Sequence, residues 1–97
     1  MNIYKLSQKE VTGYDTFDSM VVIAENEEKA RKIHPEIHHN EKVIIKDNKW
    51  QIDDGSGWTF EAGHWVSYEN RNKIKIELLG IANIKIERLI TASFWAG

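Results

Sequence analysis

The sequence predicts an α+β domain, an antiparallel sheet of about five or six strands with one short helix packed on one face. Two strand patterns come first, at Ile3–Ser7 and Met20–Ala24, and the chain's only clear helical pattern follows at residues 26–34. After the helix, strand patterns follow one another with turns between them, and the last two cover residues 74–79 and 84–94. This order favours an antiparallel sheet over alternating strand–helix–strand units.

The two N-terminal strands differ in their patterns of apolar residues. In the first, Tyr4 and Leu6 alternate with Lys5 and Ser7, which is typical of a strand with one buried face. In the second, Met20–Ala24 is apolar at every position. Such a run is buried on both faces, so we expect it in the middle of the sheet.

The helix at 26–34 is indicated by its end signals. Asn26 can accept a hydrogen bond from a free backbone amide, and the two glutamates that follow suit the positive end of the helix dipole. Pro35 should stop the helix. Ala30 and Ile33, three positions apart, predict a narrow buried stripe against the sheet.

A hairpin and a second turn are predicted in the middle of the chain. Val43–Ile45 is a strand pattern, Asp47–Asn48 suits a two-residue turn, and Trp50–Ile52 returns as the second strand. Residues 53–57 carry two glycines and two aspartates and predict another turn. The aromatic stretch over residues 58–66 fits either a strand or an ordered loop.

The C-terminal third predicts two further strands. Ile74, Ile76 and Leu78 alternate with Lys75 and Glu77, and after residues 80–83 an alternation of apolar residues resumes over residues 84–94. Since they are neighbours in the sequence, we expect these two strands to form an antiparallel pair.

Length and composition narrow the class of protein. The 97 residues fit one domain, residues 1–97, since domains typically span about 50 to 250 residues. A net charge of −2 with interspersed charges argues against duplex nucleic acid as a partner. No apolar run reaches the roughly 20 residues that a membrane span needs, and the chain has no cysteine. We therefore expect a cytoplasmic protein without disulfides or cysteine-based metal sites.

No motif indicates catalysis, a cofactor or a metal. The serines lack a nucleophile-elbow motif, and no glycine-rich phosphate loop precedes a helix. Asp15 and Asp18 fit local turn hydrogen bonds better than acid–base chemistry. His34 and His38 are four apart, but Pro35 between them breaks the helix that would align them. We expect a protein that is not an enzyme and has no cofactor and no metal ligands.

An aromatic segment followed by basic residues is the best candidate for a ligand site. Aromatic rings can stack on nucleobases while Arg and Lys meet phosphates. The alternative, that Trp58 and Trp65 simply fill the core, stays open. The candidate ligand-binding residues are Trp58, Phe60, His64, Trp65, Tyr68, Arg71 and Lys73.

The C-terminal aromatics Phe94 and Trp95 indicate an interface. A large aromatic residue at a chain end has little core to join, and such residues are common at the centres of interfaces. We therefore expect a homo-oligomer, with a homodimer as the simplest case.

Two parts of the chain resemble a family of small uncharacterised proteins from phages and prophages. The likeness rests on YDTFDSMVVIAE at 14–25 with EKARKIHP at 28–35, and on ELLGIA at 77–82 with ASFWAG at 92–97. Residues 36–63 depart from the family pattern. The resemblance implies an accessory protein that acts in the bacterial cytoplasm and antagonises host antiviral defence.

Three mechanisms fit that setting. The protein could sequester a nucleotide immune signal as a non-catalytic sponge. It could instead bind a host defence protein directly, in the manner of an anti-CRISPR inhibitor, through a sheet edge or an acidic patch such as Glu25, Glu27 and Glu28. A third hypothesis is a minor accessory protein of the virion.

Overall fold

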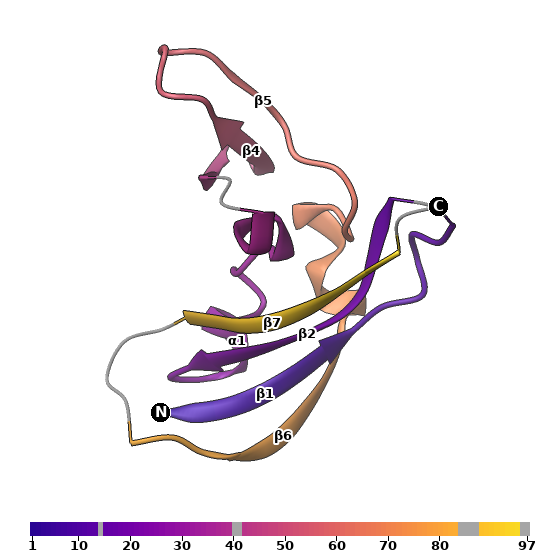
Figure 1. Ribbon diagram of the computed structural model, residues 1–97, viewed down its shortest axis with the longest axis vertical. Helices are drawn as coiled ribbons and strands as arrows, with labels where there is room; N and C mark the ends of the chain where they lie inside the picture. Colours follow the sequence, from indigo (N-terminus) through magenta and orange to yellow (C-terminus); the bar gives the residue numbers. More distant parts are fainter. Residues whose placement is uncertain (14, 40–41, 84–87, 96–97) are drawn as a thin grey trace.

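The computed structural model describes residues 1–13, 15–39, 42–83 and 88–95. Within them the chain forms two antiparallel sheets, one α-helix and two 3-10 helices (Figure 1). The strands are β1 (Asn2–Ser7), β2 (Thr16–Ala24), β3 (Val43–Lys46), β4 (Lys49–Asp53), β5 (Thr59–Glu61), β6 (Lys75–Ile81) and β7 (Arg88–Trp95). The helices are α1 (Glu27–Ala30), η1 (Pro35–His39) and η2 (Tyr68–Lys73). The predicted α+β class with antiparallel strands is confirmed.

The helix is shorter than predicted. The Asn26 side chain caps it by accepting a hydrogen bond from the Lys29 amide at 2.9 Å, as expected, but α1 ends at Ala30. The residue before a proline disfavours helical backbone, so the chain turns ahead of Pro35 and resumes as η1. About one turn of α-helix therefore forms where about two and a half were expected.

The four-stranded sheet has the order β6-β1-β2-β7. The strand predicted as central, β2, lies between two neighbours and is confirmed as central. The predicted pairing of residues 74–79 with 84–94 is wrong, because β6 pairs with β1 and β7 pairs with β2. Figure 1 shows β6 and β7 at opposite edges of the sheet. Sequence neighbours usually pair, but here each edge strand pairs with one of the two interior strands.

The three-stranded sheet, β3-β4-β5, contains the predicted hairpin. Lys46 pairs with Lys49 across a two-residue turn in which Asp47 and Asn48 have φ values of 55° and 60°. Positive φ at both positions defines the turn type that matches strand twist, and Asp and Asn tolerate it better than most residues. The ambiguous aromatic stretch resolves into the short strand β5 and a loop over residues 62–67.

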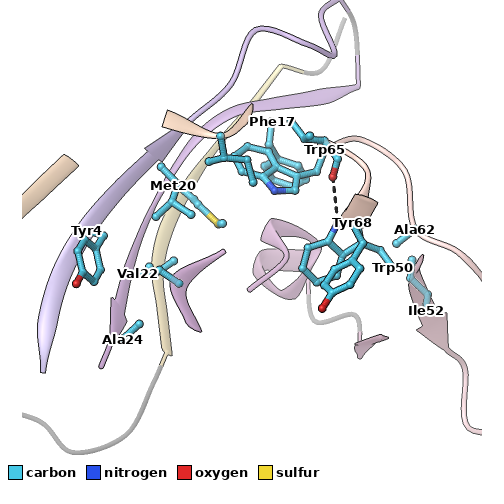
Figure 2. Packing of buried hydrophobic residues seen from close by; sticks show 14 residues of the cluster. Tyr4, Phe17, Met20, Val22, Ala24, Trp50, Ile52, Ala62, Trp65 and Tyr68 are labelled. Atoms are coloured by element: carbon cyan, nitrogen blue, oxygen red, sulfur yellow. Dashed lines mark hydrogen bonds between the residues drawn. The ribbon is translucent and has the colours of Figure 1, made fainter. Parts of the chain in front are cut away.

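The hydrophobic core joins the two sheets. Leu6, Met20 and Val22 occupy the inner face of the four-stranded sheet, and Trp50 comes from β4 of the other sheet. The Trp50 indole Nε1 donates a hydrogen bond to the Val66 carbonyl at 3.0 Å. Figure 2 shows Met20 and Val22 of the four-stranded sheet and Trp50 of the other sheet among the side chains of this cluster. The side chains that alternate with these, among them Lys5, Ser7 and Ser19, lie on the opposite, outer face of the four-stranded sheet.

Candidate functional site

The predicted aromatic site is divided between the core and the surface. Trp65 is 3% exposed and Tyr68 is 9% exposed, and both belong to the hydrophobic core. Trp58 is 77% exposed and Phe60 is 54% exposed, on or beside β5. Trp65 therefore fills the core, as one of the two predictions stated, whereas Trp58 lies at the surface. The four rings do not form one surface on which a base could stack.

His64 connects a loop to the start of β2. Its Nδ1 contacts the Asp15 carbonyl oxygen, its own carbonyl accepts a hydrogen bond from the Phe17 amide at 2.8 Å, and its Nε2 lies 3.9 Å from a Glu36 carboxylate oxygen. His64 also has a positive φ of 69°, a conformation that is uncommon outside glycine. Through these contacts His64 anchors the loop over residues 62–67 to the start of β2.

Arg71 is engaged by the protein itself. Its guanidinium lies 3.9 Å from the centre of the Tyr68 ring, donates to the Tyr68 carbonyl at 2.9 Å and lies 3.7 Å from a Glu28 carboxylate oxygen. Arg31 reinforces the same region by donating to the carbonyls of Arg71 and Ile74, each at 2.7 Å. Arg71 thus links α1 to η2 and is less available to a ligand than the sequence suggested.

Lys73 lies in a different environment, a groove on the outer face of the four-stranded sheet. We call this the lysine groove, a hollow of about 660 Å³. It is lined by Lys5, Ser7, Gln8, Lys9, Glu10, Thr12, Asp18, Ser19, Lys73 and Lys75. Only Lys73 of the predicted ligand-binding residues lines it.

The floor of the lysine groove is a cross-strand row of one lysine and two serines. Lys75 on β6 lies opposite Ser7 on β1, and Ser7 lies opposite Ser19 on β2. Directly opposite side chains in a sheet stand about 5 Å apart at Cβ. The row therefore places hydroxyl groups beside an ammonium group, and both can donate hydrogen bonds to one bound anion.

The lysines of the groove have no ion-pair partner within the described residues. Lys29, Lys32 and Lys42, by contrast, each lie within 4 Å of a carboxylate. Two carboxylates, Glu10 and Asp18, also line the groove, which leaves a surplus of two positive charges. On a chain whose net charge is −2, this surface is suited to an anionic ligand.

A buried glutamine positions the segment that forms one wall of the groove. Gln8 donates from Nε2 to the carbonyls of Val11 and Phe17 at 2.7 and 2.8 Å, and its Oε1 accepts from the Val11 amide at 2.7 Å. These three hydrogen bonds hold the turn after β1 against β2. Lys9 and Thr12 are thereby kept beside the serine row.

A second cavity, of about 570 Å³, lies beside β4, β5 and η2. It is lined by Trp50, Trp65 and Tyr68 together with Lys49, Glu61 and Glu69. The rings are mostly buried, and the two carboxylates outnumber the single lysine, so the cavity would repel a phosphate. This cavity contains part of the predicted aromatic site but suits an anionic ligand less well than the lysine groove does.

His34 is the buried titratable group of the core. It is 0% exposed, its Nδ1 accepts a hydrogen bond from the Glu36 amide at 3.0 Å, and its ring lies 5.1 Å from the Trp50 ring. Burial lowers the pKa of His34 from 6.5 to about 3, because the charged form would lose its hydration. His34 is therefore neutral at physiological pH and supports packing.

The remaining expectations concern the C-terminus, metals and membranes. The backbones of Phe94 and Trp95 end β7 beside Phe17 and Thr16, while their side chains lie outside the described residues, so the predicted interface stays a prediction.

Among the described residues, no three His, Asp or Glu side chains lie close enough together to bind one metal ion. None of the described helices is long and apolar enough to span a bilayer.

The sequence contained half of the signal for the lysine groove. The alternation of Tyr4 and Leu6 with Lys5 and Ser7 predicted that Lys5 and Ser7 share the exposed face of their strand. Lys9 lies beyond β1, and Lys73 belongs to η2, so no strand pattern covers them. The expected pairing of β6 with β7 was wrong, so the sequence did not predict that Lys75 of β6 lies opposite Ser7 of β1.

Comparisons of the chain with protein-family models, with curated proteins and with solved structures found no match.

Proposed function

We propose that this protein is a non-catalytic binding protein that holds a phosphate-bearing small molecule in the lysine groove. The observation that carries the proposal is a group of four lysines beside a row of serines, with no ion-pair partner for these lysines in the part of the chain that the structure describes. Ammonium and hydroxyl groups are good donors to phosphate oxygens. A volume of about 660 Å³ is within the range of sites that hold nucleotide-sized ligands.

Several weak contacts have to act together in such a site. One exposed ion pair contributes about 0.2–1 kcal/mol, so a single lysine would bind phosphate poorly. The binding free energies contributed by four lysines and the serine hydroxyls can add up to a useful affinity for phosphate. No aromatic side chain among the described residues lines the groove, so we expect it to recognise phosphates more than bases.

The resemblance to phage and prophage proteins supports a biological role for this binding. In that setting the ligand would be a nucleotide immune signal, and its sequestration would antagonise host antiviral defence. A sponge should release its ligand chemically unchanged. Mass spectrometry of the ligand recovered after denaturation tests this, and a hydrolysed or transferred phosphate would contradict a non-catalytic role.

We expect nucleotide binding to depend on Lys73 and Lys75. A nucleotide at about 100 times its Kd should stabilise the native state by about 2.7 kcal/mol, which raises the Tm of a domain of this size by several degrees. The double variant Lys73→Gln/Lys75→Gln should lose most of that rise. The matched control is Lys46→Gln/Lys49→Gln on the other sheet, which changes the net charge equally and should keep it. Equal losses in both variants would point to net charge and refute a site.

A second candidate function is direct inhibition of a host defence protein. It is favoured by the exposed Trp58 and Phe60, which lie with Ile45 at the three-stranded sheet. Exposed aromatic residues are typical centres of protein interfaces. In bacteria that carry a nucleotide-signalling defence system, loss of inhibition in Trp58→Ala/Phe60→Ala, but not in Lys73→Gln/Lys75→Gln, would favour this function. The reverse result would favour the sponge.

A further inference from the structure

One of the two carboxylates in the lysine groove, Asp18, is turned into it by a β-bulge. We infer that Asp18 makes the groove selective for a ribose phosphate, the part that nucleotides share, by accepting a hydrogen bond from a sugar hydroxyl. The lysine and serine side chains would hold the phosphate. This inference rests on the proposed phosphate-binding function and specifies its ligand.

The bulge is one extra residue in β2. Two consecutive residues of β7 pair with Phe17 and Ser19, so Asp18 between them has no partner on β7. Side chains alternate along a regular strand, and Met20 is buried on the inner face, so an unbulged β2 would point Asp18 inward as well. Asp18 is instead exposed and lines the groove together with Ser19. Bulges commonly redirect a side chain in this way.

Gln8 holds the bulge in place from the end of β1. Its backbone amide donates to the Asp18 carbonyl at 3.1 Å, and its side-chain Nε2 donates to the Phe17 carbonyl at 2.8 Å. Gln8 is buried. The peptide groups before and after Asp18 are therefore both fixed, which sets the direction of its side chain.

Asp18 gives the groove two chemically different ends. Asp18 and Ser19 lie on β2, and Lys75 lies on β6, with β1 between the two strands. Two strand spacings separate the carboxylate and ammonium ends by about 10 Å at the backbone. The ammonium group donates to phosphate oxygens, whereas an ionised carboxylate only accepts hydrogen bonds and is a common partner of ribose hydroxyls. A ligand that suits both ends has a phosphate attached to a sugar.

The same carboxylate disfavours ligands that are anionic throughout. A second phosphate beside Asp18 would meet a like charge, and such a contact is one source of specificity. The Asp18 side chain forms no ion pair or hydrogen bond with the residues that the structure describes, so its charge is not already neutralised. Glu10, the other carboxylate of the groove, lies in a bend after β1 and belongs to no paired strand. We therefore assign the acceptor role to Asp18.

Ribose 5-phosphate and methyl phosphate test this assignment, because both are phosphate monoesters but only the sugar carries hydroxyl groups. In NMR chemical-shift titrations, ribose 5-phosphate should bind about 5- to 10-fold more tightly than methyl phosphate, as expected for one added hydrogen bond. Asp18→Ala should reduce this preference to less than about twofold by weakening ribose 5-phosphate alone. Methyl phosphate should bind the variant as tightly as before or slightly more tightly, since a negative charge is removed.

Two matched variants locate the effect. Glu61→Ala on the other sheet removes the same charge outside the groove, and Glu10→Ala removes the other carboxylate of the groove, so both should keep the preference. Loss of the preference in Glu10→Ala, equal weakening of both ligands in Asp18→Ala, or no preference in the unaltered protein would overturn the role of Asp18 and leave phosphate binding intact. If neither ligand binds the unaltered protein, the proposed function itself is refuted.

Discussion

Replacing Trp50 with alanine is expected to lower the free energy of unfolding by about 3–5 kcal/mol, the range for large aromatic residues removed from a core. Trp50 is 3% exposed, and its ring lies 5.1 Å from both the His34 and the Tyr68 rings. Its indole also donates to the Val66 carbonyl. The substitution would leave a cavity and a buried carbonyl without its donor, where the two sheets meet.

The matched control is another tryptophan eight residues further along the chain. Trp58 is 77% exposed, so Trp58→Ala should change the free energy of unfolding by no more than about 0.5 kcal/mol. Urea unfolding followed by far-ultraviolet circular dichroism measures both variants. Comparable losses in the two would contradict the assignment of Trp50 to the core and Trp58 to the surface.

Acidification is expected to destabilise the protein through His34. The pKa of its imidazole is lowered to about 3 in the folded chain from an ordinary value of 6.5. Between these values the unfolded state binds a proton that the folded state excludes, so stability is full above the unfolded pKa and falls as the pH drops toward about 3. The slope is about 1.4 kcal/mol per pH unit well below the unfolded pKa, which is several kcal/mol over the window.

The variant His34→Asn isolates this contribution. Asparagine does not titrate, and its side-chain oxygen can replace Nδ1 as acceptor for the Glu36 amide. The variant should be less stable at neutral pH because it loses ring packing, but its stability should fall less between pH about 7 and about 4. Parallel pH profiles from urea unfolding would refute the role of His34.

Local structure was largely predictable from the sequence. The alternation of Tyr4 and Leu6 with Lys5 and Ser7 predicted which face of β1 is buried, and the apolar run Met20–Ala24 predicted an interior strand. Asp47–Asn48 predicted a tight hairpin, because few other residues accept positive φ at both turn positions. These features depend on residues that are close in the chain.

The burial of individual aromatic residues could not be predicted in the same way. Trp58 and Trp65 occupy similar polar, glycine-containing stretches, but one is exposed and the other is in the core. The difference arises because the loop over residues 62–67 is held against β2 through His64 and Phe17. A contact between residues 47 positions apart in the chain leaves no trace in either local pattern.

The sequence by itself determined the period-two faces that carry Lys5 and Ser7 on one strand and Lys75 and Glu77 on another. Only the tertiary structure decided that these faces lie side by side. A period-two pattern specifies which side of a strand meets the core, because side chains alternate, but backbone hydrogen bonds are the same for any neighbour. The pairing of β6 with β1 therefore depends on packing of the whole sheet, and that pairing assembles the lysine groove.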